Sequence, residues 1–257
     1  MLVVISPAKR LDWAATHLKG TEPAFTREAA ILAGHARQLS LKDLKALMSL
    51  SDDLARLNRD RFREFTAEPG RETLRPAALA FAGDTYIGLD ARSLDPEDLD
   101  WAQDHLRILS GLYGLLRPLD EIQPYRLEMG SRLKTRRGKT LYDFWGDAIA
   151  RSLRETADRL GTDTLLNCAS QEYFGAVEPA ALGLRIITPI FLEDRNGEAK
   201  TVSFFAKRAR GAMARFVVER RLRDPAGLLE FDSGGYAYDS RRSQPDAPAF
   251  VRSYPDE

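Results

Sequence analysis

Chemically versatile side chains follow several apolar segments that are predicted to be strands. They supply a carboxylate, a phenol, hydroxyl groups and cations, and they are Ser6, Lys9, Ser110, Ser170, Glu172, Tyr173, Lys207 and Arg210. A general acid/base site with an anion clamp requires this combination of groups. We therefore keep an enzyme acting on a nucleotide or a nucleic acid as one hypothesis, with Glu172, Tyr173 and Lys9 as candidate catalytic residues. The alternative is that Glu172 only pairs with a nearby cation.

Two segments are rich in cations and poor in acids. The first, residues 126–139, contains one acid, Glu128, and the cations Arg126, Arg132, Lys134, Arg136, Arg137 and Lys139. The second, residues 207–223, contains one acid, Glu219, and begins with the cations Lys207, Arg208 and Arg210. If the segments share a face, they can follow the phosphates of a nucleic acid. The alternative is that these cations pair with acids elsewhere, as most surface charges do.

The overall charge does not mark a nucleic-acid protein. The 257 residues include 38 basic and 38 acidic ones, so the formal net charge is zero. This argues against a globally basic protein but leaves room for a local basic cleft, because local charge decides binding.

A glycine-containing turn lies in the segment Leu109-Ser110-Gly111-Leu112-Tyr113-Gly114. It looks like the hairpin of a helix-hairpin-helix DNA-binding motif, in which glycines let backbone N–H groups approach a phosphate. Ser110 stands where such hairpins carry proline, and the glycine spacing is one residue longer. The alternative is a strand-to-loop turn packed in the core.

Metal and cofactor signatures are missing from the sequence. The histidines His17, His35 and His105 are far apart, and none has a cysteine or an acid at ligand spacing. No dinucleotide fingerprint, phosphate-binding loop or Gly-x-Ser-x-Gly elbow occurs. We therefore predict no metal and no cofactor, and a carboxylate-only iron site stays open as an alternative. Cys168 follows an apolar run and is predicted to be a buried core residue.

Cellular location is predicted from three features. Met1 leads straight into apolar residues without a basic n-region, so no signal peptide is expected. No apolar run approaches the roughly 18–20 residues that a membrane span needs. The single cysteine excludes an internal disulfide framework. We expect a cytoplasmic protein without membrane contact.

Hydrophobic patterning and turn signals predict the elements that position these groups. Strands are predicted at residues 1–6, 78–81, 164–169, 185–192 and 200–205. Helices are predicted within residues 23–66 and over residues 95–105, 141–160 and 207–223. We predict a turn at residues 83–86, a hairpin at Asn196-Gly197, and edge strands and loops over residues 231–257. No linker or repeat divides the chain, so we expect a single α/β domain over residues 1–257, with a mixed sheet surrounded by helices.

Several blocks occur in order along the whole chain. They are Ile5-Ser6-Pro7-Ala8-Lys9, Leu109-Ser110-Gly111-Leu112-Tyr113-Gly114, Arg117-Pro118-Leu119-Asp120, Pro124-Tyr125-Arg126-Leu127-Glu128-Met129-Gly130, Ala169-Ser170 with Glu172-Tyr173, and Phe205-Ala206-Lys207 with Ala209-Arg210-Gly211. Together these blocks resemble the YaaA peroxide stress resistance family. Lys9-Arg10 and Cys168 depart from the usual family pattern, and neither departure threatens the resemblance.

The resemblance implies a cytoplasmic protein that is linked to protection from hydrogen peroxide, through less free intracellular iron and less oxidative DNA damage. It implies an α/β domain with a positively charged cleft, a helix-hairpin-helix element, and affinity for duplex or branched DNA. Carried over to this chain, the cleft is lined by Lys9, Arg126, Lys207 and Arg210, and the hairpin is Gly111–Gly114. The resemblance supplies no catalytic residue.

The leading hypothesis is a DNA-binding protein of the peroxide response rather than an enzyme. The residues expected to contact DNA are Lys9, Gly111, Gly114, Arg126, Arg132, Lys134, Arg136, Arg137, Lys207, Arg208 and Arg210. Binding should depend steeply on salt and show little sequence preference, because phosphate contacts supply most of the affinity. Direct iron sequestration gains little support without clusters of histidine and cysteine. We expect a monomer whose partner is DNA.

Overall fold

A five-stranded sheet forms the core of the computed structural model, which describes residues 1–255. Its strands, in spatial order, are β6 (Gly114–Leu116), β5 (Leu106–Ser110), β1 (Leu2–Ile5), β8 (Thr164–Cys168) and β9 (Arg185–Ile187). β1 is parallel to both β5 and β8, and β6 runs antiparallel to β5. Every residue of β1, β5 and β8 is buried. Near-continuous apolar runs are typical of strands that are covered on both faces.

The register of this sheet aligns the ends of its central strands. Ile5 lies opposite Ile108 on one side and Cys168 on the other. Because parallel strands carry their carboxyl ends to the same edge, the loops that follow β1, β5 and β8 meet there. The strands predicted at residues 1–6 and 164–169 are confirmed.

A second, four-stranded sheet is formed by the C-terminal part of the chain. Its strands, in spatial order, are β11 (Glu198–Lys200), β10 (Ile190–Arg195), β13 (Ala249–Ser253) and β12 (Ala237–Tyr238). The hairpin predicted at Asn196-Gly197 joins β10 to β11, and both residues have positive φ. β13 lies between β10 and β12, so the tail contributes an interior strand as well as an edge strand. Of the predicted tail, residues 256–257 lie outside the described part.

Two short ladders complete the sheets. β2 (Arg10–Leu11) pairs with β4 (Phe81–Ala82), and β3 (Arg75–Pro76) pairs with β7 (Glu121–Ile122). The mixed α/β class is confirmed, but the strands form several sheets rather than one. The extent of the domain, residues 1–257, stays a prediction.

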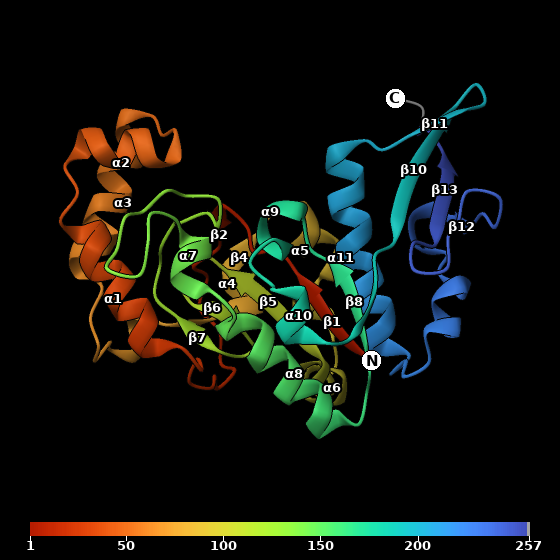
Figure 1. Ribbon diagram of the computed structural model, residues 1–257, viewed down its shortest axis with the longest axis horizontal. Helices are drawn as coiled ribbons and strands as arrows, with labels where there is room; N and C mark the ends of the chain where they lie inside the picture. The colour runs from red at the N-terminus through yellow and green to blue at the C-terminus, as the bar shows by residue number, and fades with distance from the viewer. Residues whose placement is uncertain (256–257) are drawn as a thin grey trace.

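Helices α1 (Thr26–Arg37), α2 (Leu41–Met48) and α3 (Asp52–Glu64) form the predicted helical region. They lie at the end of the molecule opposite the second sheet (Figure 1). The side chains of Ser40 and Ser51 accept hydrogen bonds from backbone N–H groups in the first turns of α2 and α3. Such caps satisfy N–H groups that have no partner within the helix.

The other long helices pack near the central sheet. They are α6 (Pro96–His105), α8 (Ala148–Leu160) and α11 (Ser203–Glu219). Asp95 caps α6 as predicted. The helix predicted over residues 141–160 is two helices, α7 (Leu141–Trp145) and α8, because Gly146 adopts a positive φ between them.

α11 packs closely against α5 (Asp84–Leu89). A Cβ atom built on Gly211 would lie 1.8 Å from the carbonyl oxygen of Thr85, and one built on Gly88 would lie 2.0 Å from that of Arg208. Only glycine permits backbones to approach this closely.

Four local predictions are wrong. The strand predicted at residues 185–192 is two strands, β9 and β10, which belong to different sheets. Residues 77–80 form helix α4 (Ala77–Ala80) instead of a strand, since alanine has the highest helix propensity. The turn predicted at residues 83–86 is the start of α5, stabilised by packing on α11. The strand predicted at residues 200–205 ends at Lys200, because the buried carboxylate of Glu193 accepts a hydrogen bond from the Val202 N–H and α11 begins at the next residue.

Short elements connect these parts. They are the helices α9 (Gln171–Phe174) and α10 (Pro179–Leu182) and the 3₁₀ turns at Arg71–Thr73, Ala91–Ser93, Pro225–Glu230 and Ser233–Gly235. No helix within residues 1–255 is long and apolar enough to cross a membrane.

Candidate functional site

Two serines join the loops that follow β1 and β8. The Ser6 hydroxyl oxygen accepts a hydrogen bond from the Ser170 N–H at 2.9 Å, and the two hydroxyl oxygens are 3.3 Å apart. Next to β5, the Ser110 hydroxyl lies 2.6 Å from the hydroxyl of Tyr125. The polar groups predicted at these three strand ends are therefore tied into the fold at one edge of the sheet.

Glu128 lies at the centre of this strand-end cluster. Its Oε1 atom accepts hydrogen bonds from Arg126 Nε and Nη2 at 3.0 and 2.9 Å, and Lys9 Nζ lies 3.4 Å from the same oxygen. The other oxygen, Oε2, is buried and has no hydrogen-bond partner among the described residues. Two cations share one carboxylate, so this group of three carries a net positive charge, and Lys9 exposes 66% of its side chain.

Glu172 lies beside this cluster and is exposed. Its Oε1 atom accepts a hydrogen bond from the Gly130 N–H at 3.0 Å, and the Tyr142 hydroxyl donates to its backbone carbonyl. No cation of the described chain lies within 4.0 Å of its carboxylate. The alternative that Glu172 only pairs with a cation is therefore wrong in this structure.

Buried tyrosines form the floor of the cluster. The pKa of the Tyr173 hydroxyl is raised well above its usual value, first by burial and then by Tyr125 and nearby carboxylates. Burial also raises the pKa of Tyr86, whose hydroxyl donates to the Ser6 carbonyl. Both phenols are neutral near pH 7; the Tyr86 hydroxyl donates a hydrogen bond, and the Tyr173 oxygen accepts one from the Met129 backbone N–H. The cavity among Lys9, Glu128 and Tyr173 has a volume of about 10 Å³, which is room for about one water molecule.

The first basic segment continues from this cluster as an exposed loop. Arg132, Lys134, Arg136 and Lys139 are exposed, and within residues 1–255 no carboxylate lies within 4.0 Å of them. Arg137 differs, because it pairs with Glu28 at 3.6 Å and lies over the Phe144 ring.

The second basic segment lies on α11. Lys207 and Arg208 are exposed, Arg210 is half-buried, and none of the three has a carboxylate partner in the described chain. Three later cations of this segment are paired: Arg215 with Glu219, Arg220 with Glu230, and Arg221 with Glu97, whereas Arg223 has no carboxylate within 4.0 Å in the described chain. The expectation that surface cations pair with acids therefore holds for the end of α11 and not for its beginning.

Helix α5 connects this basic turn of α11 to the strand-end cluster. Gly88 of α5 faces the backbone of Arg208, while Tyr86 of the same helix donates to Ser6 after β1. The charge of Arg210 also acts on Cys168, the last residue of β8. Figure 1 shows α9, α5 and the amino-terminal half of α11 around the end of the central sheet.

Gly111 and Gly114 do not form a helix-hairpin-helix element, and this prediction is wrong. Strands β5 and β6 flank them, and both residues are buried. A Cβ atom on Gly111 would lie 2.3 Å from the Leu127 carbonyl oxygen, and one on Gly114 would lie 2.6 Å from the Trp145 ring. The glycines serve close packing, which was the alternative drawn from the sequence, and no phosphate can approach their backbone.

A pair of helices joined by a short link does occur elsewhere, as α2 and α3. The link is residues 49–51, and α3 begins with Asp52 and Asp53. Acidic side chains at a helix N-terminus repel an anion that would bind there. This helix pair therefore lacks the electrostatics of a phosphate site.

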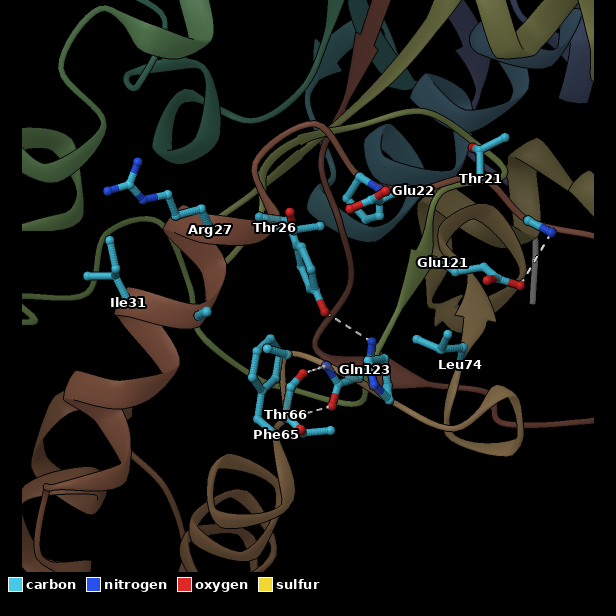
Figure 2. A pocket seen from close by; sticks show the side chains of 16 residues that line it. Thr21, Glu22, Thr26, Arg27, Ile31, Phe65, Thr66, Leu74, Glu121 and Gln123 are labelled. Atoms are coloured by element: carbon cyan, nitrogen blue, oxygen red, sulfur yellow. Dashed lines mark hydrogen bonds between the residues drawn. The ribbon is translucent and has the colours of Figure 1, made fainter.

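A large cavity lies away from the strand-end cluster, between α1 and the segments 65–74 and 20–23 (Figure 2). Its volume is about 790 Å³, and it is lined by Phe65 and Tyr113 among other apolar side chains. The side-chain oxygen of Gln123 accepts a hydrogen bond from the Thr66 N–H, and its side-chain nitrogen donates one to the Thr66 carbonyl oxygen. Both polar atoms of this side chain are therefore already hydrogen-bonded. The sequence offered no signal for this cavity, because its lining comes from segments far apart in the chain.

The described chain contains no group of side chains that is arranged to bind a metal ion. Within residues 1–255, no three side chains of histidine, cysteine, aspartate or glutamate are placed to hold a metal ion together.

Comparison with known proteins decides the family. The family model described as "Peroxide stress protein YaaA" matches residues 1–242. The chain belongs to the YaaA peroxide stress protein family. It is 69% identical over 254 residues to a UPF0246 protein of Ruegeria pomeroyi, with 99% of each chain covered. It is 65% identical over 257 residues to one of Roseobacter denitrificans, again covering 99% of each chain, and 61% identical over 257 residues to one of Dinoroseobacter shibae, covering 100% of this chain and 96% of the relative.

Membership in the YaaA family confirms the resemblance read from the sequence blocks. Most of these blocks surround the carboxyl edge of the central sheet, where the structure places Ser6, Lys9, Glu128, Ser170 and Glu172. Glu128, Tyr86 and Tyr125 belong to this cluster and were not among the candidate catalytic or DNA-contact residues. The position of Glu128 between two conspicuous cations, Lys9 and Arg126, was not visible in the sequence.

Proposed function

We propose that this YaaA-family protein binds duplex or branched DNA as part of the peroxide stress response. The proposed DNA surface consists of the strand-end cations Lys9 and Arg126, the loop at residues 131–139, and the first two turns of α11. The observation that carries the proposal is the set of cations on this surface that have no acidic partner.

Unpaired cations are the chemical requirement for DNA affinity. A cation that is already paired must lose its partner before it can displace a counterion from a phosphate, whereas an unpaired one can do so directly. On the proposed DNA surface, seven exposed or half-exposed cations meet this requirement in the described structure: Arg132, Lys134, Arg136, Lys139, Lys207, Arg208 and Arg210.

The side chains of the same surface favour DNA binding without strong sequence preference. Its long cationic side chains suit phosphate oxygens, which carry no sequence information. Coverage of DNA by this surface would protect it from oxidative damage in the cytoplasm. The proposed link to lower free iron would then be indirect, because no metal-binding group of side chains occurs in the described chain.

The test measures DNA affinity as a function of salt, by fluorescence anisotropy with a labelled duplex and a labelled four-way junction. Lys207→Ala should weaken binding to both and lower the slope of log K against log salt by about one. Arg220→Ala is the matched control, since it removes a cation that caps the C-terminus of the same helix and is paired with Glu230. Absence of binding at low salt, or binding that is independent of salt, would overturn the proposal.

A second candidate is an enzyme that acts on a nucleotide or nucleic acid. The observation in its favour is that the Glu172 carboxylate is exposed, without a cation partner in the described chain, near the neutral phenol of Tyr173, which lines the same small cavity as Lys9. A base, an acid and a cation would then be available together. The cavity of about 10 Å³ at the cluster weighs against a buried substrate.

Glu172 separates the two candidates. Glu172→Gln removes the charge and keeps an oxygen that can accept from the Gly130 N–H. If DNA binding is the function, this variant should bind DNA as well as or better than the wild type and still protect cells from peroxide. If the protein is an enzyme, protection should fail while DNA affinity survives.

A further inference from the structure

A separate cavity lies at the opposite end of β5 from Ser110. Its volume is about 300 Å³, and it is bounded by the β5–β6 hairpin, helix α8 and the segment around residues 117–120. Three arginines line it: Arg107, Arg117 and Arg159. None of the three belongs to the proposed DNA surface.

Arg107 forms the floor of this cavity and is only 3% exposed. Its Nη1 atom donates to the carbonyl oxygens of Gln103 and Leu106 at 2.9 and 2.8 Å. Its Nε and Nη2 atoms have no acceptor among the described residues, and no carboxylate of residues 1–255 lies within 4.0 Å of the guanidinium. Buried arginines are almost always paired, so this group has unused capacity for an anion.

The one deeply buried acid that lines the cavity, Asp120, is already in use. It accepts hydrogen bonds from the Arg117 backbone N–H at 2.7 Å, from Arg117 Nε at 3.0 Å, and from the Thr21 hydroxyl at 2.7 Å. Burial, together with the charges of Arg117 and Arg159, lowers the pKa of Arg107 to about 10. Arg107 therefore stays protonated near pH 7, in a cavity lined by three arginines and three acids, of which Asp120 is bonded to Arg117 and not to Arg107.

Two exposed acids, Glu22 and Glu155, also line the cavity, but in the described structure neither forms an ion pair. Their negative charges at the rim of the cavity oppose the entry of an anion. They do not pair with the guanidinium of Arg107 at the floor of the cavity. Arg159 is exposed on α8 and, like Arg107, has no carboxylate within 4.0 Å in the part of the chain described. The cavity therefore has a cation at its floor and a cation at its rim.

We propose that this cavity binds a small phosphate-type anion, either inorganic or carried by a small molecule, between Arg107 and Arg159. The planar guanidinium group offers parallel N–H donors that match two oxygens of a phosphate. Low local dielectric strengthens such a contact. A volume of about 300 Å³ is at the small end of ligand sites, and a DNA duplex cannot reach a residue that is only 3% exposed.

Isothermal titration calorimetry at constant ionic strength tests this assignment. The probes are inorganic phosphate, pyrophosphate and a phosphate monoester, adenosine monophosphate, which separate a free anion from one carried by a larger group. At least one probe should bind saturably to the wild type, and Arg159→Ala should weaken that binding about tenfold, as expected for a lost charge-assisted hydrogen bond. Arg107→Met should abolish it.

Two further variants keep the test decisive. Arg151→Ala removes a cation from the same helix that is paired with Asp147, so it should leave phosphate binding unchanged. Glu155→Gln should tighten binding, because it removes a negative charge from the rim. If no probe binds in the millimolar range, or if Arg159→Ala and Arg151→Ala behave alike, the assignment is overturned. DNA affinity is expected to be unchanged in Arg159→Ala, so failure of either proposal leaves the other standing.

Discussion

Lys9 Nζ and Glu128 Oε1 lie 3.4 Å apart, although Lys9 follows the first strand and Glu128 lies in the long segment after β7. Arg126 contacts the same oxygen at 2.9 Å. This arrangement joins Lys9 and Arg126, the two strand-end cations of the proposed DNA surface, through one carboxylate. The Glu128 carboxylate also holds these two cations, which would otherwise be free to contact DNA phosphates. This effect can be tested by substitution of Glu128.

Glu128→Gln should increase DNA affinity and decrease stability. The amide retains an acceptor for Arg126 but loses the charge that attracts Lys9 and Arg126, so both cations become available to phosphates. The free energy of unfolding should fall by about 1–3 kcal/mol, as expected when a charged hydrogen-bond partner is replaced at a largely buried site. Anisotropy titrations and urea denaturation measure the two effects. Weaker DNA binding by this variant would contradict a role of Lys9 and Arg126 in phosphate contact.

Arg136→Ala should affect DNA affinity, whereas Arg137→Ala should affect stability. Arg136 is exposed and unpaired in the described chain, so its loss should weaken DNA binding and leave stability unchanged. Arg137 pairs with Glu28 and lies 4.6 Å from the centre of the Phe144 ring, so its loss should lower stability by about 0.5–1 kcal/mol. Thermal melting and anisotropy on both variants provide the comparison. Equal effects on affinity would mean that pairing does not determine which cations reach DNA.

Gly211→Ala should strongly destabilise the protein. The added Cβ would lie 1.8 Å from the Thr85 carbonyl oxygen, which is backbone and can move away only if α5 shifts from α11. The expected loss is about 3 kcal/mol or more, as for overpacking that forces backbone movement. Gly34→Ala in α1 is the control, because nothing lies within 4 Å of the added atom. That variant should gain about 0.5–1 kcal/mol from better helix propensity. Similar urea midpoints for the two variants would refute the close packing of α5 on α11.

Cys168 should resist both thiol reagents and hydrogen peroxide in the folded protein. Burial raises the pKa of its thiol from the ordinary value of 9.0 to about 12, so the reactive thiolate is nearly absent near neutral pH. Ellman's reagent should react only after unfolding in urea, and mass spectrometry should find the cysteine reduced after peroxide treatment. Rapid oxidation in the native state would show that the β8 end opens to solvent.

The pKa of Cys168 also predicts the sign of a pH effect on stability. The unfolded chain ionises first as pH rises, since its thiol has the lower pKa. The contribution of the buried neutral thiol is therefore complete below about pH 9 and decreases as pH rises towards about 12. The buried tyrosines shift in the same direction, so Cys168→Ala isolates the thiol's share of the alkaline loss. An unchanged alkaline profile in Cys168→Ala would mean that the tyrosines dominate.

Local signals in the sequence were sufficient for several elements. The apolar runs of β1 and β8, the Asp95 cap of α6, and the hairpin at Asn196-Gly197 all appear as predicted. Each depends on properties of neighbouring residues, namely burial on both faces, side-chain capping and tolerance of positive φ. The family could be read for the same reason, since its blocks are short and occur in order.

Tertiary structure alone decided the rest. Gly111 and Gly114 have the local sequence of an exposed hairpin, yet the packing of Leu127 and Trp145 against them buries the turn. No local pattern distinguishes Arg136, which is unpaired, from Arg137, which meets Glu28 on a distant helix. Ion pairs, burial and the meeting of strand ends depend on residues far apart in the chain. The sequence by itself therefore determined which residues could do chemistry, and only the fold decided which of them are left free to do it.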